Sequence, residues 1–182
     1  GMETYRCVIT RRAVRTYKPR PVPDKALKRI LEAARRAPSA RHRQPWHFIV
    51  VRDREGLRRL AASTTGHYLK DAPVALAVAV DSSNKWGDMD GARAVQNMVL
   101  VAWEMGLGSC WVANIPDAVA RKVLALPKEL RLLTVLPIGY PACKDLATER
   151  WKRSGFIPRR RKRLEEIASS ERYGERIKLA GR

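Results

Sequence analysis

The chain has 182 residues, enough for one sizeable domain with its own hydrophobic core. Hydrophobic residues make up 45% of the chain, which excludes a disordered protein, and no apolar run reaches the roughly 18–20 residues that a membrane-spanning helix needs. The formal net charge of +19 attracts polyanions such as nucleic acid. Since the N-terminus carries no hydrophobic signal segment, we expect a cytoplasmic protein.

The first half of the chain predicts helices alternating with strands. Apolar residues recur at helical spacing at Leu27, Ile30, Leu31 and Ala34, which predicts an amphipathic helix that begins at Asp24 and that Pro38 stops. The other elements expected in this half are a short helix over 3–10, an extended proline-rich connector, a strand over 46–52, a short helix over 53–63 and a buried strand over 72–81.

The second half predicts one long apolar helix and two further strands. Residues 90–105 are apolar on nearly every side from Val95 to Trp103, so we expect this helix to be buried all round, by the rest of the chain or by a second subunit. A third strand is expected within 106–114, a helix from Pro116 or Asp117 to Ala125, and a fourth strand over 130–141. With no repeat and no internal linker, the sequence predicts a single α+β domain over 1–182, in which 144–182 form a basic C-terminal arm.

Three basic clusters are the first candidates for a binding site. They are Arg11, Arg12 and Arg15; Arg41, His42 and Arg43; and the run from Arg159 to Arg163. Arginine forks bind phosphate in a bidentate manner, so clusters that converge in space would form a phosphate site. Spacing along the sequence does not show that they converge, and a solvated charged face is the alternative for each.

Several common catalytic patterns are missing from the sequence. There is no GxGxxG fingerprint after a strand, no GxxxxGK[ST] loop, no GxSxG elbow and no evident Cys/His or acid–base pair. The three cysteines are widely spaced and the three histidines lack metal-ligand spacing, so we expect neither a disulfide framework nor a metal site. Such a composition is compatible with a cofactor that supplies the chemistry.

Four ordered blocks of the sequence resemble the nitroreductase family. "TRRAVRTYKPRPVP" followed by "APSARHRQPW" is similar to the start of the family, which has RRSxR, PVP and APSxxNxQPW before a strand. "DGARAVQNMVLVAWEMGLGSCWVAN" resembles its long dimer helix and glycine turn, and "VLPIGYP" with a basic tail resembles its closing strand and C-terminal arm. The blocks run in the family's order over nearly the whole chain.

The resemblance implies a fold and an activity. The expected fold is an α+β intertwined homodimer, in which helices flank a central, mostly antiparallel sheet and two FMN molecules lie at the subunit interface. The expected enzyme takes hydride from NAD(P)H and reduces a nitroaromatic, a quinone or a similar small acceptor by a ping-pong mechanism. FMN supplies the chemistry, so no catalytic side chain is expected.

The resemblance also implies which residues contact FMN. The first block would hold the phosphate and flavin, the loop after Pro38 would come from the other subunit, the backbone after Cys110 would face the flavin ring, and two tail arginines would close on the phosphate. Ala13 and His42 stand where the family usually has serine and asparagine, and the turn before the second strand contributes one residue. The expected contacts are Arg11, Arg12, Ala13, Arg15, Pro38, Ser39, Ala40, His42, Thr65, Trp111, Val112, Ala113, Asn114, Arg159 and Arg161.

Three alternatives stay open. One is a specialised branch of the same family that fragments flavin or removes halogen, although the short connection before the long helix offers no inserted lid for a dehalogenase. The second is a family member that has lost flavin, given Ala13 and His42. The third is a basic nucleic-acid-binding protein, which is disfavoured because the sequence has no helix-turn-helix, zinc-finger or RNA-binding aromatic signature.

Overall fold

The computed structural model describes residues 3–64, 66–142 and 161–177. The chain divides into two compact units, residues 1–147 and 148–182, and the helices and strands lie in the first. In the described part of the second unit there are a 3-10 helix, η3 (Leu164–Glu166), and a bridge between Ser169 and Arg176.

A four-stranded antiparallel sheet forms the centre of the first unit. Its strand order is β1-β2-β4-β3, and β2 is buried along almost its full length because seven consecutive residues are apolar. Val78 pairs with Thr134 while the next residue, Ala79, pairs with Leu132, so Leu133 forms a β-bulge in β4. The strands are β1 (Trp46–Val51), β2 (Val74–Asp81), β3 (Gly108–Ser109) and β4 (Leu130–Gly139).

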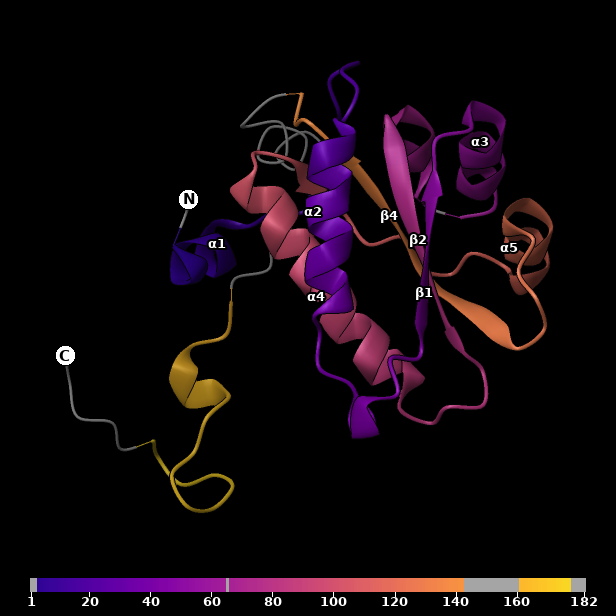
Figure 1. The fold of residues 1–182 in the computed structure, drawn as a ribbon. Helices are drawn as coiled ribbons and strands as arrows, with labels where there is room; N and C mark the ends of the chain where they lie inside the picture. Colours follow the sequence, from indigo (N-terminus) through magenta and orange to yellow (C-terminus); the bar gives the residue numbers. More distant parts are fainter. Residues whose placement is uncertain (1–2, 65, 143–160, 178–182) are drawn as a thin grey trace. The chain divides into compact units, whose positions relative to one another are not determined.

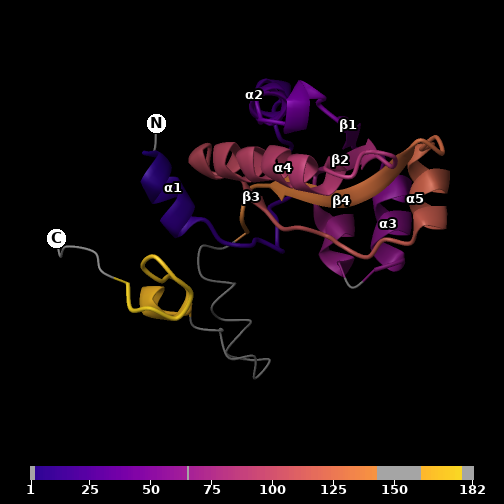
Figure 2. The ribbon, with the colours of Figure 1, turned by 90° about the horizontal axis from the view of Figure 1, so that it is seen from below.

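Helices cover both faces of the sheet. Figure 1 shows α2 and α4 on one side of the sheet and α3 and α5 on the other. Alternate side chains of β2 point to opposite faces, so that Val74, Leu76 and Val78 join the core on the side of α2 and α4, while Ala75 and Ala77 join the core on the side of α3 and α5. Seen from below, α4 lies on one side of the sheet and α3 and α5 on the other (Figure 2). The helices are α1 (Thr4–Thr10), α2 (Asp24–Arg35), α3 (Arg54–Ala62), α4 (Gly87–Glu104) and α5 (Asp117–Leu124), with 3-10 helices η1 (Ala40–His42) and η2 (His67–Asp71).

Most expected elements are present, with differences in the third strand and in the burial of the long helix α4. Only two residues of the region 106–114 form a regular strand, β3, because the chain then leaves β4 and returns to it at Val112. The helix α2 begins at Asp24 as expected, after Pro23, and the Asp24 carboxylate pairs with Arg52. Within the described residues no helix is long and apolar enough to cross a membrane.

The long helix α4 is not buried all round in the single chain. Val95, Met98 and Ala102 lie in the core, but Trp103 on its other side is only half-buried and Gln96 is exposed. The chain alone therefore covers one face of this helix and leaves much of the apolar remainder accessible.

Candidate functional site

The N-terminal arginine cluster lies beside β3. The backbone N–H of Val14 donates to Ser109 O at 2.9 Å, and Ala13 forms a bridge with Ser109. This close approach requires a glycine at position 108, because a Cβ there would lie 2.5 Å from the Val14 side chain. The contact places the arginines that flank Val14 next to the segment that follows β3.

Within the described part of the chain, these arginines have no acidic partner. Among the described residues, no carboxylate pairs with Arg11, Arg12 or Arg15, whereas arginines elsewhere do form ion pairs, such as Arg29 with Glu104 at 2.8 Å. Clustered guanidinium groups without carboxylate partners are free to bind an anion such as phosphate.

Tyr68 brings η2 to the same place. The Arg15 guanidinium lies over its ring at 5.7 Å, and its hydroxyl lies 3.3 Å from Cys110 Sγ and donates to Trp111 O at 3.1 Å. Burial of the phenol, helped by the neighbouring Cys110, raises the pKa of Tyr68 to about 12. The hydroxyl therefore stays protonated, and able to donate, throughout the physiological pH range.

Residues 111–113 run beside β4 and are held on both sides, and the next residue, Asn114, has a left-handed φ of 61°. Val112 exchanges both backbone hydrogen bonds with Val135, at 3.1 and 3.3 Å, and its carbonyl also accepts from Thr134 Oγ1 at 2.9 Å. On the opposite side, Thr64 Oγ1 donates to Ala113 O at 3.0 Å. The segment is therefore fixed by contacts from β4 and from the turn that precedes η2.

The outer edge of residues 111–113 offers donors. The carbonyls of Trp111 and Ala113 are occupied, but among the described residues nothing accepts from the backbone N–H groups of these two exposed residues. Exposed N–H groups beside unpaired arginines suit a ligand that carries both hydrogen-bond acceptors and an anionic group.

The loop that follows α2 is held by a buried carboxylate. Ala40 N–H donates to Asp90 Oδ2 at 3.0 Å, and Asp90, fully buried on α4, also pairs with Arg93 at 2.6 Å. Within the loop, Ser39 Oγ accepts from the Gln44 N–H at 2.9 Å. Three non-glycine residues have positive φ, a left-handed conformation that costs energy for most side chains: Arg41 (53°), His42 (56°) and Gln44 (50°).

The structure brings together part of the expected site. Ala13 and Val14 lie against Ser109 of β3, just after the C-terminal end of α4, and Tyr68 contacts both Arg15 and Trp111 there. The loop with Pro38, Ser39, Ala40 and His42 lies instead at the other end of α4, where Ala40 binds Asp90. From Asp90 to Glu104 the helix rises about 20 Å at 1.5 Å per residue. One chain therefore does not assemble the whole expected set.

Three residues that were expected to contact FMN lie outside the described part of the first unit. Thr65 and Arg159 lie outside the described residues, and Arg161 is exposed in the second unit of the chain.

Four residues that the sequence did not single out shape the site. They are Thr64, Tyr68, Asp90 and Thr134. Thr134 had a visible signal, since it is the one hydroxyl in the apolar run of β4. Asp90 had none, because an acidic residue in the first turn of a helix usually only complements the helix dipole.

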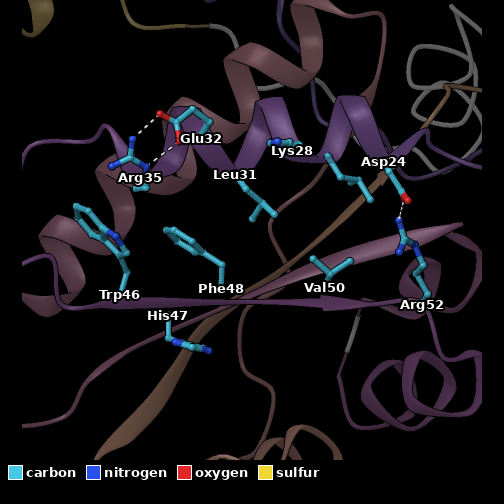
Figure 3. A pocket seen from close by; sticks show the side chains of 11 residues that line it. Asp24, Lys28, Leu31, Glu32, Arg35, Trp46, His47, Phe48, Val50 and Arg52 are labelled. Atoms are coloured by element: carbon cyan, nitrogen blue, oxygen red, sulfur yellow. Dashed lines mark hydrogen bonds and ion pairs between the residues drawn. The ribbon is translucent and has the colours of Figure 1, made fainter.

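A groove between α2 and β1 is a separate feature. Trp46, Phe48 and Val50 point from β1 toward Leu31 of α2, whereas His47 points away (Figure 3). The groove has a volume of about 630 Å³, and much of its charged rim is paired internally, Glu32 with Arg35 at 2.6 Å and Asp24 with Arg52. None of the expected FMN contacts lines it.

Known proteins match this chain over most of its length. The profile of the Nitroreductase family matches residues 8–80 and 64–140. A Methanothermobacter thermautotrophicus protein, provisionally named NADH dehydrogenase/NAD(P)H nitroreductase, is 39% identical over an alignment of 150 residues that covers 78% of this chain and 78% of that protein.

Solved structures agree with the family match. A Parabacteroides distasonis protein of the same provisional name superposes with a TM-score of 0.81 at 32% identity, covering 93% of this chain and 99% of the other. The FMN-dependent nitroreductase of Clostridium difficile superposes with a TM-score of 0.72 at 34% identity, covering 76% and 87%. The sequence blocks, the antiparallel sheet between helical layers and these matches agree, and the chain belongs to the nitroreductase family.

Proposed function

We propose that this chain is an FMN-dependent oxidoreductase that takes hydride from NAD(P)H and passes the electrons to a nitroaromatic, quinone or similar small acceptor. The observation that carries the proposal is the outer edge of residues 111–113, with open N–H donors close to Arg15, which belongs to a cluster of three arginines that have no carboxylate partner among the described residues. FMN when bound would supply the redox chemistry, accepting hydride from one substrate and releasing electrons to the next.

The residues present fit FMN at both of its polar ends. The three arginines supply cationic forks for the phosphate, and the N–H group of Ala113 supplies a donor for an acceptor atom of the isoalloxazine ring. Backbone donors held by a sheet need no reorganisation when charge develops at the atoms they face. The protein would thus bind, orient and electrostatically support the cofactor, without a side chain that acts as acid or base.

The proposed site is completed by a second copy of the chain. If two α4 helices pack antiparallel about a two-fold axis, the loop held by Asp90 in one subunit reaches the end of α4 where the other subunit's arginines lie. Apolar side chains that such packing could cover are available, since Tyr5 and Ile9 of α1 are 69% and 60% exposed and α4 leaves Trp103 half-buried. The homodimer therefore explains why one chain separates the two parts of the expected site.

Cofactor binding and turnover test the proposal directly. Purified protein is titrated with FMN while flavin fluorescence is followed, and the loaded protein is then mixed without oxygen with NADH or NADPH in a stopped-flow instrument. We expect saturable binding at micromolar FMN or below, bleaching of the flavin band by at least one nicotinamide, and reoxidation by a quinone or a nitroaromatic. Absence of FMN binding at micromolar concentration would refute the proposal.

The same preparation separates the two rival classes. A protein that takes up no FMN but binds duplex DNA, with an affinity that falls steeply with salt, would be a nucleic-acid-binding protein. Light scattering of the FMN-loaded protein gives the mass in solution, and a monomer that binds FMN tightly would contradict the shared site.

A further inference from the structure

On the outer edge of residues 111–113, the backbone carbonyls accept hydrogen bonds from side chains and not from a neighbouring strand. Because Val112 turns its N–H and C=O toward β4, Trp111 and Ala113 turn theirs to the opposite side. On that side Tyr68 donates to Trp111 O and Thr64 donates to Ala113 O. A pairing strand would occupy N–H and C=O groups alike, whereas these two hydroxyls occupy only the carbonyls.

The carbonyl of Val112, which lies between those of Trp111 and Ala113 in the sequence, also accepts from a hydroxyl. Thr134 Oγ1 donates to Val112 O, so three consecutive carbonyls accept from three side chains that lie 43, 22 and 49 residues away in the sequence. Thr134 is 1% exposed on a strand whose neighbours Val135 and Leu136 are fully buried, and it directly follows the bulge at Leu133. Bulges next to functional sites commonly re-aim a side chain, as this one does for a buried hydroxyl.

We infer that Thr64, Tyr68 and Thr134 are positioning residues that hold the carbonyls of residues 111–113 and thereby present the N–H group of Ala113 to the acceptor edge of the bound flavin. The inference rests on the proposed function, because it assigns a role within the same site. These side chains act through the backbone that they hold, so they are not catalytic residues.

The inference predicts that the hydroxyls tune the flavin potential. N–H donors held against the ring stabilise the negative charge that reduction adds, so they favour the reduced cofactor over the oxidised one. Loosening the segment should weaken binding of reduced FMN more than binding of oxidised FMN. The reduction potential should then become more negative.

Thr134→Val is the principal test, because valine keeps the shape of threonine and removes only the hydroxyl. We expect oxidised FMN to bind about fivefold more weakly, as for the loss of one hydrogen bond. If reduced FMN loses a further tenfold, the two-electron potential falls by about 30 mV. The measurements are FMN titration and the potential of the bound flavin against a reference dye, neither of which requires turnover.

Two further variants separate positioning from structure. Thr134→Ser keeps the hydroxyl but loses a buried methyl group, so it should be less stable than Thr134→Val and yet retain the wild-type potential. Ser63→Ala is the matched control, because the Ser63 hydroxyl donates to the carbonyl of Leu60 within the end of α3, at 2.9 Å. It should leave the potential unchanged. Tyr68→Phe and Thr64→Val should each shift the potential in the same direction as Thr134→Val.

The outcomes distinguish this inference from the proposed function. If the wild-type protein binds no FMN, the proposed function fails. If the wild type binds FMN, but Thr134→Val keeps its affinity and its potential within about 10 mV of wild type, the inference is wrong and the proposed function stands. A shift in Thr134→Ser as large as that in Thr134→Val would also overturn the inference, because packing and not the hydroxyl would then be responsible.

Discussion

Asp90 is expected to contribute more to stability than any other acidic residue of α4. Its carboxylate is fully buried and accepts from Ala40 N–H and from Arg93, and Asp90→Ala removes both contacts. A charge-assisted hydrogen bond contributes about 1.5–3 kcal/mol, and the partly buried Ala40 N–H loses its acceptor. Since Arg93 is about half exposed and can turn to water, we expect Asp90→Ala to cost about 3 kcal/mol. Asp90→Asn, which keeps one acceptor, should cost about half as much.

Asp88 provides a control on the same turn of the same helix. It pairs with Arg131, but both partners are substantially exposed, and such pairs contribute about 0–1 kcal/mol. Both acids lie in the first turn and interact with the helix dipole alike, so the difference between Asp88→Ala and Asp90→Ala isolates the buried contact. Urea denaturation should separate the two variants by about 1 M in midpoint, for a slope near 2 kcal/mol per M.

A second readout links this contact to the proposed site. Asp90→Ala should also weaken FMN binding, because the loop it releases carries Ser39 and His42, and Asp88→Ala should not. Equal destabilisation by the two substitutions, within about 0.5 kcal/mol, would refute the reasoning that burial gives the Asp90 contact its value.

Three further predictions concern the other parts of the site. Gly108→Ala places a Cβ 2.5 Å from Val14, so it should destabilise the protein by about 1–3 kcal/mol and weaken FMN binding. Gly106 has open space around it but a positive φ, so Gly106→Ala should cost only about 1 kcal/mol in the same urea assay. Arg12→Gln should raise the dissociation constant for FMN about tenfold through loss of a charge-assisted contact to phosphate, whereas the same change at Arg58, which pairs with Glu55, should not alter the titration. The raised pKa of Tyr68 means that the folded state holds the phenol proton more tightly than the unfolded state does. The contribution of Tyr68 to stability is therefore complete below pH 10 and declines as the pH rises toward 12. In a pH series of denaturation curves, Tyr68→Phe should remove this part of the decline in stability at alkaline pH.

The elements that the sequence predicts well are those whose signal is local. The apolar run of β2 and the helical spacing of Leu27, Ile30 and Ala34 each depend on neighbours within a few residues, and the structure confirms both. The short β3 is different, because the chain beyond it pairs with β4 through one residue, Val112, and no local pattern marks a single bridge. Its boundaries were therefore not accessible from the sequence.

The residues of the candidate site also differ in whether a local sequence signal marks them. The arginines at positions 11, 12 and 15 stand out in the sequence, and so does the segment after β3. The hydroxyl contacts of Tyr68 and Thr64 do not, because each spans more than 40 residues and depends on how η2 lies against that segment. Of these contacts only Thr134 could have been suspected, as a polar residue in an apolar strand that needs a buried partner.

The geometry of the loop after α2 gives a reason for its unusual sequence. His42 has a φ of 56°, a conformation in which asparagine, aspartate and histidine are several-fold enriched over other non-glycine residues. A histidine at the position where the family pattern usually has asparagine therefore suits this backbone conformation. Strained residues persist only where other contacts fix them, and here Asp90 holds one end of the turn while Ser39 Oγ holds the other. The loop therefore has its shape within the single chain, so that a second subunit would meet a preformed surface carrying Arg41 and His42 and would not have to order it on binding.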